Sequence, residues 1–431
     1  MTSKTLEHWL KHLETLHPSE MELGLERVSQ VAHALDLLPL KLPVVTVAGT
    51  NGKGSTVAVL ESLLSECGLR PGTFTSPHFL RFNERIRVNR EEVDDEAIVA
   101  AFEAIEAARS EVSLTYFEFA TLAALLVFKR EAVDYVLLEV GLGGRLDSAN
   151  MIDADVAVIT SIDLDHQDWL GDTKGLIARE KAGIMRRGRP VVIADPAPPP
   201  ELLQVAQDLE AGPVYRLGEE FECSGPAACW QGSLVSSKGA VVPLKDMSSA
   251  ALLAANVCAA AQAALLLGVE FHQEQLQRAI ESSIRPGRLQ RLKVGEQHYL
   301  LDVAHNPAAI DKLLENIAAT PCNGRTIALF SAMKDKAVDE MLAACSGYFD
   351  AWFLGEQTAN PRAMPAAQIG ELLRKHGQGP ISESKNLRQA FRRAQSVMSG
   401  EDLLVVFGSF FTVAAVLPQL EKDRGKFGTD E

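Results

Sequence analysis

A short glycine-rich stretch carries the clearest chemical signal in the chain. It reads Gly49-Thr50-Asn51-Gly52-Lys53-Gly54-Ser55. Glycines let backbone N–H groups approach an anion, the start of a helix favours negative charge, and a lysine adds a point charge. The usual spacing is G-x-x-x-x-G-K-[ST], whereas here Gly54 separates Lys53 from Ser55. The stretch predicts a phosphate cradle; the alternative is an ordinary turn with a surface lysine.

Two further stretches place metal-binding residue types at strand ends. Glu139 closes the apolar run 135–139, at the position from which an acid reaches Mg²⁺ beside bound phosphates. His166 follows the run 156–162 and stands next to Asp165. Ligands bind at this edge of open sheets, so both residues are candidate metal ligands. A solvent-exposed Glu139 and a structural, hydrogen-bonding His166 remain the alternatives.

The second half of the chain has weaker chemical signals. Asp302 and His305 flank a predicted strand end, which makes them candidates for handling a proton or orienting a substrate. Ser409 lies between a strand and a helix, again a natural anion cradle. Ordinary turn chemistry explains these residues equally well. Lys181, taken alone, predicts a lysine on a helix surface.

The elements that would position these residues alternate between strand and helix. Apolar, β-branched runs predict buried parallel strands, and amphipathic stretches between them predict helices. The expected strands are 44–48, 135–140, 156–162, 191–194, 299–303, 326–330, 351–354 and 403–407, with a short one ending at 75. This alternation predicts an α/β fold with a doubly wound, mostly parallel sheet.

The length of 431 residues favours two domains. We expect a first domain over residues 1–284, a hinge over 285–294 and a smaller, Rossmann-like α/β domain over 295–431. A small β excursion is expected at 221–244, with helices at about 249–268 and 272–283 closing the first domain. The nucleotide loop has no counterpart in the second half, so that half is expected to hold a substrate rather than a triphosphate.

Residues 76–90 are expected to form an ordered loop. Four arginines stand there against one acid: Arg81, Arg85, Arg87 and Arg90 against Glu84. In an acidic chain this would be a local basic island for an anionic substrate, and a solvated charged loop is the alternative.

Composition excludes several classes of protein. The formal net charge of −15 argues against general binding of nucleic acid or of an anionic membrane. The six cysteines form no C-x-x-C pair and the N-terminus resembles no signal peptide, so a reducing cytoplasm is expected. The uncharged stretch 247–269 has membrane-span length, but its alanines and polar residues favour a buried helix.

Several strings, taken in order, resemble the bifunctional dihydrofolate synthase/folylpolyglutamate synthase family of the Mur ligase superfamily. The resemblance covers essentially the whole chain and rests on residues 23–28, 49–55, 75–78, 114–118, 139–147, 165–166, 180–184, 286–288, 302–307 and 408–409. The departures from the pattern are small: Ser148 stands where alanine is common, and Gly54-Ser55 varies within the family.

The resemblance implies a P-loop ATPase domain followed by a glutamate-ligase domain, and it implies roles for individual residues. Residues matching the nucleotide site are Thr50, Asn51, Gly52, Lys53, Gly54, Ser55, Asn256, Arg288 and Asp302. Residues matching Mg²⁺ ligands are Ser76, Glu139 and His166. Residues matching the pterin-acid pocket are Thr115, Tyr116, Phe117, Glu118, Leu146, Asp147 and Ser148, with the stretch Thr15 to Pro18 a weaker candidate.

The resemblance also implies three catalytic residues: Lys53, His305 and Lys181, the last matching a carbamylated lysine near a second metal. His305 and Ser409 resemble positions near the amino-acid substrate. The implied reaction is ATP-dependent ligation of L-glutamate to dihydropteroate and to reduced folates through an acyl phosphate. The implied cofactors are ATP and Mg²⁺ at two sites, in a monomer with no nucleic-acid or membrane partner.

Three other functions remain open. A monofunctional folylpolyglutamate synthase would lack dihydropteroate use, which the tract Leu114 to Glu118 argues against. A cell-wall Mur ligase usually carries an additional N-terminal substrate domain, for which the segment before residue 44 is too short. A P-loop binding module without ligase activity would leave the second α/β half unexplained.

Overall fold

The computed structural model describes residues 5–17, 22–249, 252–284, 286–358 and 360–427. Within them the chain divides into two compact units, residues 1–284 and 285–431. The stretch expected as a hinge contains a strand of the second unit, Gln290–Val294. Pro18, Arg285 and residues 250–251, which take part in the expectations above, lie outside the described residues.

The first unit is built on one large sheet with strand order β4-β3-β2-β5-β1-β6-β7-β8. Strands β2, β5, β1, β6, β7 and β8 run parallel, and β3 and β4 are antiparallel additions at one edge. The strands are β1 (Val44–Ala48), β2 (Pro71–Phe74), β3 (Ile86–Val88), β4 (Glu91–Glu92), β5 (Tyr135–Glu139), β6 (Val156–Ile159), β7 (Val191–Ile193) and β8 (Val214–Arg216).

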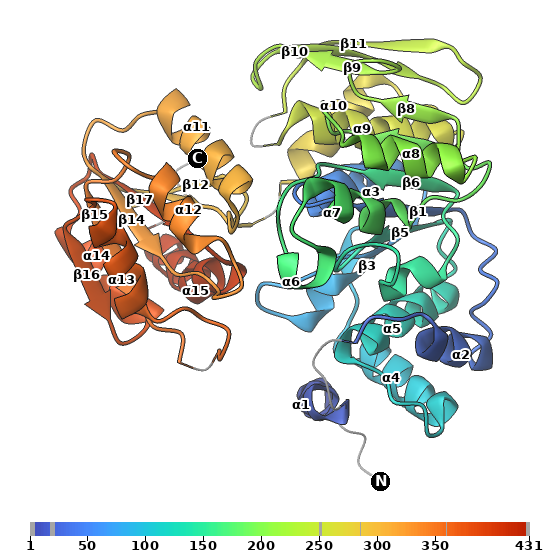
Figure 1. Ribbon diagram of the computed structural model, residues 1–431, viewed down its shortest axis with the longest axis horizontal. Helices are drawn as coiled ribbons and strands as arrows, with labels where there is room; N and C mark the ends of the chain where they lie inside the picture. Colours follow the sequence, from blue (N-terminus) through green and yellow to red (C-terminus); the bar gives the residue numbers. More distant parts are fainter. Residues whose placement is uncertain (1–4, 18–21, 250–251, 285, 359, 428–431) are drawn as a thin grey trace. The chain divides into compact units, whose positions relative to one another are not determined.

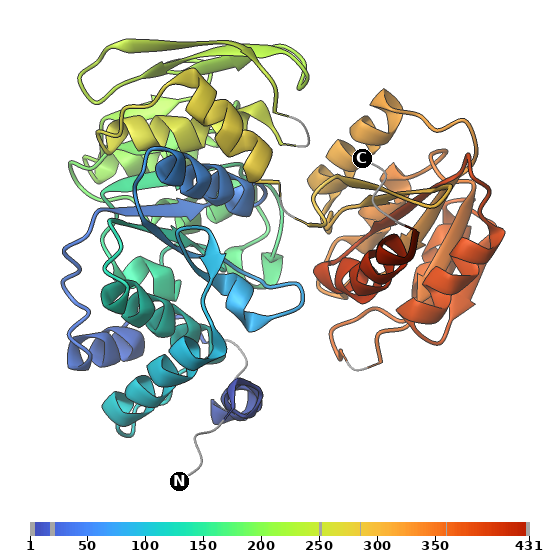
Figure 2. The ribbon, with the colours of Figure 1, turned by 180° about the vertical axis from the view of Figure 1, so that it is seen from behind.

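Helices cover both faces of this sheet, as Figures 1 and 2 show. Val45 and Val47 of β1 pack with α3, α9 and α10, whereas Val44 faces the cluster of α1, α2, α4 and α5. The helices are α1 (Leu6–Leu16), α2 (Glu26–Ala34), α3 (Lys53–Glu66), α4 (Asp95–Arg109), α5 (Tyr116–Arg130), α6 (Gln167–Leu170), α7 (Lys174–Ala182), α8 (Pro200–Asp208), α9 (Ala254–Leu266) and α10 (Gln273–Ser282). Because both faces are buried, the central strands are almost entirely apolar, with Thr46 in β1 and Glu139 at the end of β5 as exceptions.

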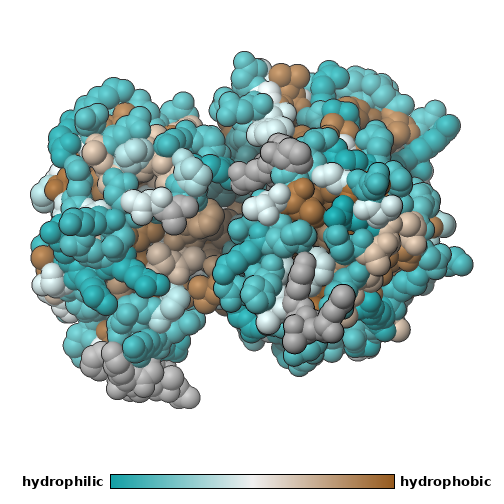
Figure 3. Space-filling view, turned by 90° about the horizontal axis from the view of Figure 1, so that it is seen from below, coloured by the Kyte–Doolittle hydropathy of each residue, from teal (hydrophilic) through white to brown (hydrophobic). Residues whose placement is uncertain are grey.

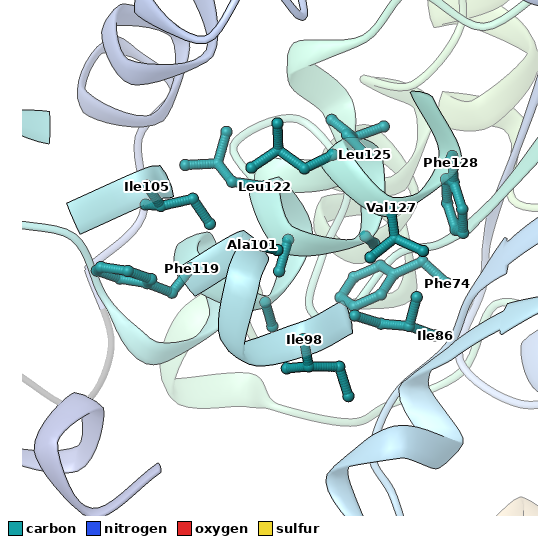
Figure 4. Close-up of a cluster of buried hydrophobic side chains, with 14 of the residues drawn as sticks. Phe74, Ile86, Ile98, Ala101, Ile105, Phe119, Leu122, Leu125, Val127 and Phe128 are labelled. Atoms are coloured by element: carbon teal, nitrogen blue, oxygen red, sulfur yellow. The ribbon is translucent and has the colours of Figure 1, made fainter. Parts of the chain in front are cut away.

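Figure 4 shows the core between the sheet and helices α4 and α5. Phe74 and Ile86 come from the strands, Ile98 and Ile105 from α4, and Phe119 from α5. All five side chains are fully buried. Burying side chains of this size contributes roughly 1.5–3 kcal/mol each, which fixes α5 against the sheet. The N-terminus of α5 is thereby held at one end of the sheet.

A small antiparallel sheet, order β11-β10-β9, packs on α9 (Figure 1). Its strands are β9 (Glu222–Ser224), β10 (Trp230–Val235) and β11 (Val241–Met247). Trp230 and Leu234 point into the core, while Val241 is 68% exposed. The β excursion expected at 221–244 is therefore present, and its apolar side covers the uncharged helix α9.

The second unit has a sheet of order β12-β13-β17-β14-β15-β16, parallel except for β12. Its strands are β12 (Gln290–Val294), β13 (Gln297–Leu301), β14 (Thr326–Phe330), β15 (Ala351–Gly355), β16 (Ile381–Ser384) and β17 (Leu403–Phe407). Its helices are α11 (Pro307–Ala319), α12 (Val338–Ala344), α13 (Ala366–Lys375), α14 (Leu387–Val397) and α15 (Phe410–Phe427). The sequence missed β12 and β16, which are edge strands with exposed side chains and little apolar signal.

Candidate active site

The residues singled out in the first unit gather at one edge of its sheet. Strands β2, β5, β1 and β6 are neighbours and parallel, so their carboxyl ends meet there. Ser76 follows β2, Glu139 ends β5, the loop 49–52 follows β1, and His166 comes after β6. After β1 the chain crosses to β2 on one side of β1, and after β5 it crosses to β6 on the other side of β1. This is the crossover point at which open α/β sheets bind ligands.

The glycine loop wraps around its own lysine. Lys53 Nζ donates to the carbonyl oxygens of Gly49 at 2.9 Å and of Thr50 at 3.2 Å. The hydroxyl of Thr50 donates to the Asp163 carbonyl at 3.0 Å, and Thr160 Oγ1 donates to the Asn51 carbonyl at 2.7 Å. The segment after β6 therefore holds the loop in place, and α3 begins at Lys53 with its N–H groups pointing at the edge.

Gly52 makes the turn into α3 with φ +93°, a conformation that L side chains rarely adopt. A Cβ there would lie 2.7 Å from both side-chain amide atoms of Asn256, a buried residue of α9. Asn256, predicted to contact the nucleotide, thus lies directly against the loop.

We expect Gly52→Ala to weaken nucleotide binding by at least about 30-fold, because the new methyl group displaces Asn256 and strains the loop. Isothermal titration with AMPPNP and Mg²⁺ measures this affinity. Gly68→Ala is the matched control: Gly68 also has positive φ, +77°, but a Cβ there meets nothing within 4 Å. Equal losses of affinity in both variants would show that backbone strain, rather than the contact with Asn256, is responsible.

The carboxylate of Glu139 lies between the glycine loop and Ser76. It accepts the backbone N–H of Ser76 at 3.1 Å, and its oxygens lie 3.5 and 3.6 Å from where a Cβ of Gly54 would be. Glu139 is only 4% exposed, so the alternative of a solvent-exposed strand-end glutamate is wrong. His166 has a left-handed φ of 50° just before α6 and is partly exposed.

A hydroxyl, a carboxylate and an imidazole at one sheet edge suit a hard divalent cation that keeps several waters. Among the described residues, no group of three His, Cys, Asp or Glu side chains is placed so that it could hold a metal ion. The buried carboxylate of Glu139 beside the phosphate loop fits Mg²⁺ or Mn²⁺ bound largely through phosphate and water.

Lys181 is buried on α7, with 4% of its surface exposed, so the surface position expected from the residue alone is wrong. Its Nζ donates to the carbonyl of Gly49 at 2.8 Å, which also accepts from Lys53. The turn after β5 holds α7 here: a Cβ on Gly144 would lie 2.9 Å from the Lys181 carbonyl oxygen. Two ammonium groups therefore converge on one carbonyl oxygen.

The two stretches assigned to the pterin-acid pocket lie together. Ser148 Oγ is 2.6 Å from Thr121 Oγ1 of α5, and a Cβ on Gly141 would lie 2.5 Å from the ring of Phe117. Ser148, which stands where alanine is common in the family, is thus accommodated by a hydrogen bond to Thr121. Tyr116 begins α5 beside this junction.

Two acids assigned to the pterin-acid pocket make contacts that stabilise the local structure. Glu118 closes a capping box with Thr115 and forms an ion pair with Arg27 at 3.1 Å. Asp147 accepts the backbone N–H groups of Leu142 and Ala149 at 2.8 and 3.0 Å. Burial raises the pKa of Asp147 to about 6, although these N–H groups and the charge of Lys53 oppose the shift. None of these contacts of Glu118 and Asp147 was predicted from the sequence.

The stretch 76–90 is not the exposed basic island that the sequence suggested. It contains a 3₁₀ helix, Phe82–Arg85, and strand β3. Arg87 is 4% exposed and bonds the carboxylate of Glu61 with its Nε and a terminal nitrogen, all at 3.0–3.1 Å. Arg81 pairs with Asp95. The Arg87 charge is therefore buried in an ion pair and the exposed Arg81 charge is paired, so the arginines do not form one continuous basic surface.

Arg85 differs from its neighbours. It is 9% exposed, and its Nε donates to His78 Nδ1 at 2.7 Å. Burial, with a smaller effect from the charge of Arg85, lowers the pKa of His78 to about 4, so the ring is neutral at pH 7. Burial also lowers the pKa of Arg85, which remains a cation because its ordinary pKa is so high.

In the second unit, Arg288 and His305 lie beside Phe410, which starts α15. The guanidinium of Arg288 lies 5.2 Å from its ring centroid, and the His305 ring lies 6.3 Å from it. Asp302 accepts the N–H groups of Leu289 and Ala304 at 2.8 and 2.7 Å. Burial raises the pKa of Asp302, while the charge of Arg288 opposes the shift. His305 Nδ1 is 2.8 Å from the Val303 carbonyl, which only accepts, so Nδ1 carries the hydrogen.

Ser409 caps the start of α15: its Oγ accepts the N–H of Thr412 at 3.1 Å. Phe410 is the member of this group that sequence reasoning passed over, because an aromatic residue opening a helix looks like ordinary core. Thr15 lies at the end of α1, and Pro18 lies outside the described residues.

No helix in the part of the chain that the structure describes is long and apolar enough to span a membrane. The uncharged helix α9 covers 13 residues, Ala254–Leu266, short of the about 20 that a span requires. The molecular face in Figure 3 is largely hydrophilic, with scattered apolar patches.

Comparison with known proteins supports one family. The Mur ligase middle domain matches residues 47–220, and the Mur ligase glutamate ligase domain matches residues 287–410. A dihydrofolate synthase/folylpolyglutamate synthase from Escherichia coli is 41% identical over 424 residues, which cover 97% of this chain and 96% of the relative. The chain belongs to the dihydrofolate synthase/folylpolyglutamate synthase family. Both the family and the α/β fold class predicted from the sequence are confirmed.

Solved structures of this family of ATP-dependent ligases share the whole fold. E. coli FolC in complex with DHPP and ADP has a TM-score of 0.92 at 40% identity, covering 98% of this chain and 99% of that one. A bifunctional folylpolyglutamate synthase/dihydrofolate synthase with Mn, AMPPNP and L-glutamate bound has a TM-score of 0.87 at 39% identity, covering 97% and 98%.

Proposed function

We propose that the chain joins L-glutamate to dihydropteroate and to reduced folylpolyglutamates, using ATP and releasing ADP and phosphate. The observation that carries this proposal is the sheet edge of the first unit. There the glycine loop follows β1, the buried carboxylate of Glu139 ends β5, and Gly141 just after β5 meets Phe117 in the first turn of α5. Relatives named for both reactions match the chain over nearly its full length.

The first chemical step brings two anions together. An oxygen of the substrate carboxylate attacks the γ-phosphorus of ATP, the bond to the bridging oxygen breaks, and ADP leaves. Thr50 to Ser55 supply backbone N–H groups to the phosphates, and Lys53 leaves its carbonyl partners to meet the transferring phosphoryl group. When bound, Mg²⁺ held at Ser76, Glu139 and His166 would neutralise phosphate charge.

The second step forms the amide. The amine of glutamate attacks the acyl carbon, inorganic phosphate leaves, and a proton is lost from nitrogen. His305 is suited to this proton because its Nδ1 hydrogen is engaged by Val303, which leaves Nε2 as the accepting nitrogen. Arg288 and Asp302 are proposed to contact the nucleotide, and Ser409 is proposed to lie near the amino acid. Shielding from water matters, because an acyl phosphate hydrolyses readily.

Lys181 is proposed to react with CO₂ as a carbamate: its neutral amine adds to CO₂ and loses a proton. The reaction replaces one of two cations at the Gly49 carbonyl by an anionic oxygen ligand for a second Mg²⁺. In protein equilibrated with ¹³C-bicarbonate we expect a carbamate carbon signal by NMR. Lys181→Arg should abolish the signal, whereas Lys174→Arg, at the exposed start of the same helix, should retain it. Fully active protein without the signal would contradict the carbamate.

The proposed function is tested with purified protein, MgATP and L-glutamate, with dihydropteroate or tetrahydrofolate as the acid. Phosphate release is followed and the product mass determined. Amide product from both acids is expected. Product from the folate alone would indicate a monofunctional folylpolyglutamate synthase, and no product from either would indicate nucleotide binding without ligation. The free state of all six cysteines accords with the cytoplasmic location that we propose.

A further inference from the structure

Arg85 is a buried cation with unused hydrogen-bonding capacity. A guanidinium has five N–H donors, of which the Nε hydrogen of Arg85 goes to His78. The two terminal nitrogens make no hydrogen bond to any described residue, and they are not among the buried polar atoms sealed from solvent. The side chain is nevertheless 91% buried, being 9% exposed. The terminal nitrogens of the guanidinium therefore keep some contact with solvent.

The carboxylates near Arg85 accept hydrogen bonds from other residues. Glu84 accepts the backbone N–H groups of Phe79, Leu80 and Arg81 at 2.6–2.7 Å. Glu139 accepts the N–H of Ser76. Both attract Arg85 electrostatically, but neither forms an ion pair with it. Aromatic rings lie beside it instead: Tyr116 and Phe82, at 5.7 and 5.8 Å from the guanidinium carbon. Cation–π contacts offset only part of the cost of burying a charge.

The position of Arg85 links the two halves of the first unit's site. Tyr116 opens α5 in the pocket assigned to the pterin acid, and Glu139 stands at the phosphate edge. Arg85 lies against the Tyr116 ring and near enough to Glu139 for electrostatic attraction, so a carboxylate placed between these two residues would meet its guanidinium. A carboxylate is planar and matches the fork of two terminal guanidinium nitrogens.

We propose that Arg85 binds the reacting carboxylate of the acid substrate through its two terminal nitrogens, with His78 fixing the direction of the fork. The proposal rests on the proposed function for the identity of the acid. The reacting group is the benzoate carboxylate of dihydropteroate in one reaction and the glutamyl γ-carboxylate in the other, so Arg85 serves both. Its charge reduces the repulsion between this carboxylate and the γ-phosphate.

The test compares Arg85→Gln and Arg85→Lys with wild type in dihydropteroate binding, measured by titration in the presence of ADP and Mg²⁺. Arg85→Gln should weaken binding at least about 30-fold, since two charge-assisted hydrogen bonds are lost. The dihydropteroate affinity of Arg85→Lys should lie between those of wild type and Arg85→Gln, because lysine keeps the charge but not the two forked N–H donors. Arg81→Gln is the matched control on the same segment, an exposed arginine that pairs with Asp95.

A truncated ligand separates a lost contact from a damaged pocket. The probe is 6-anilinomethyl-7,8-dihydropterin, which is dihydropteroate without its carboxyl group. Wild type and Arg85→Gln should bind it within about twofold of each other, while differing strongly for dihydropteroate. An equal loss for both ligands would assign Arg85 a structural role and overturn the proposal.

The γ-phosphate of ATP is the other anion that could use the fork. Arg85→Gln should leave AMPPNP affinity within about twofold of wild type and raise the KM for the acid. A loss confined to AMPPNP would overturn the carboxylate assignment. If Arg85→Gln ligated as well as wild type, the Arg85 proposal alone would be overturned. If wild type bound dihydropteroate through Arg85 but had no ligase activity, the proposed function would be overturned and the Arg85 contact would remain.

Discussion

Glu139→Gln is expected to lower kcat at least about 1000-fold while leaving the fold intact. The amide keeps an oxygen that can accept the Ser76 N–H, so the local structure survives. The negative charge at this sheet edge is lost, and with it the carboxylate of the proposed Mg²⁺ ligand set of Ser76, Glu139 and His166. Steady-state kinetics over a range of Mg²⁺ concentrations measures the loss, and calorimetry checks that Tm changes by only a few degrees.

The matched control for Glu139 is Glu131→Gln. Glu131 lies just before β5, at the far end from Glu139, and pairs with Arg70 at the surface. Exposed pairs contribute little, so this variant should behave as wild type. A Glu139→Gln enzyme with normal turnover and unchanged Mg²⁺ dependence would remove the metal assignment. A His166→Ala enzyme with these properties would remove His166 from the ligand set.

Glu61→Ala is expected to lower the free energy of unfolding by about 3–5 kcal/mol, because it leaves the buried guanidinium of Arg87 without its partner. Glu61 on α3 and Arg87 on β3 are 2% and 4% exposed, and the pair joins the helix that begins at the phosphate loop to the sheet edge. Urea unfolding and calorimetry measure the loss.

Two comparisons isolate the buried charge as the cause. Removing both charges, as in Glu61→Leu with Arg87→Met, should recover much of the stability lost in Glu61→Ala. Glu270→Ala breaks the pair with Lys238, in which the side chains are 86% and 82% exposed, and should cost under about 0.5 kcal/mol. If Glu61→Ala cost no more than Glu270→Ala, the Arg87 charge would have another partner.

The sequence predicted the fold well wherever a strand is buried on both faces. Runs such as Thr326–Phe330 and Leu403–Phe407 are apolar apart from Thr326 and bounded by turns, so β14 and β17 were placed with their observed limits. The order of strands in the sheets could not be read, because it depends on long-range pairing. Edge strands such as β16 were missed since only one of its four residues is buried.

The gathering of the candidate residues at one sheet edge was predictable from the sequence, but their contacts were not. The glycine loop, Glu139 and His166 each come at or after the end of a buried strand, which predicted that they lie at the edge where ligands bind. The burial of Lys181 depends on Gly144 packing against α7 from another loop, and that of Arg87 depends on Glu61 in a different helix. Such pairings join residues far apart in the chain, and no local pattern records them.

The placement of β1 in the middle of its sheet has a consequence for synthesis. Val44 pairs with Val136 of β5, and Val45 pairs with Val156 of β6. Both neighbours leave the ribosome long after β1 does, so this apolar strand must wait unpaired while β2, α4 and α5 emerge. The nascent first unit should therefore be most dependent on chaperones before residue 160 appears, and the phosphate loop should acquire its shape only when the segment after β6 arrives to hold it.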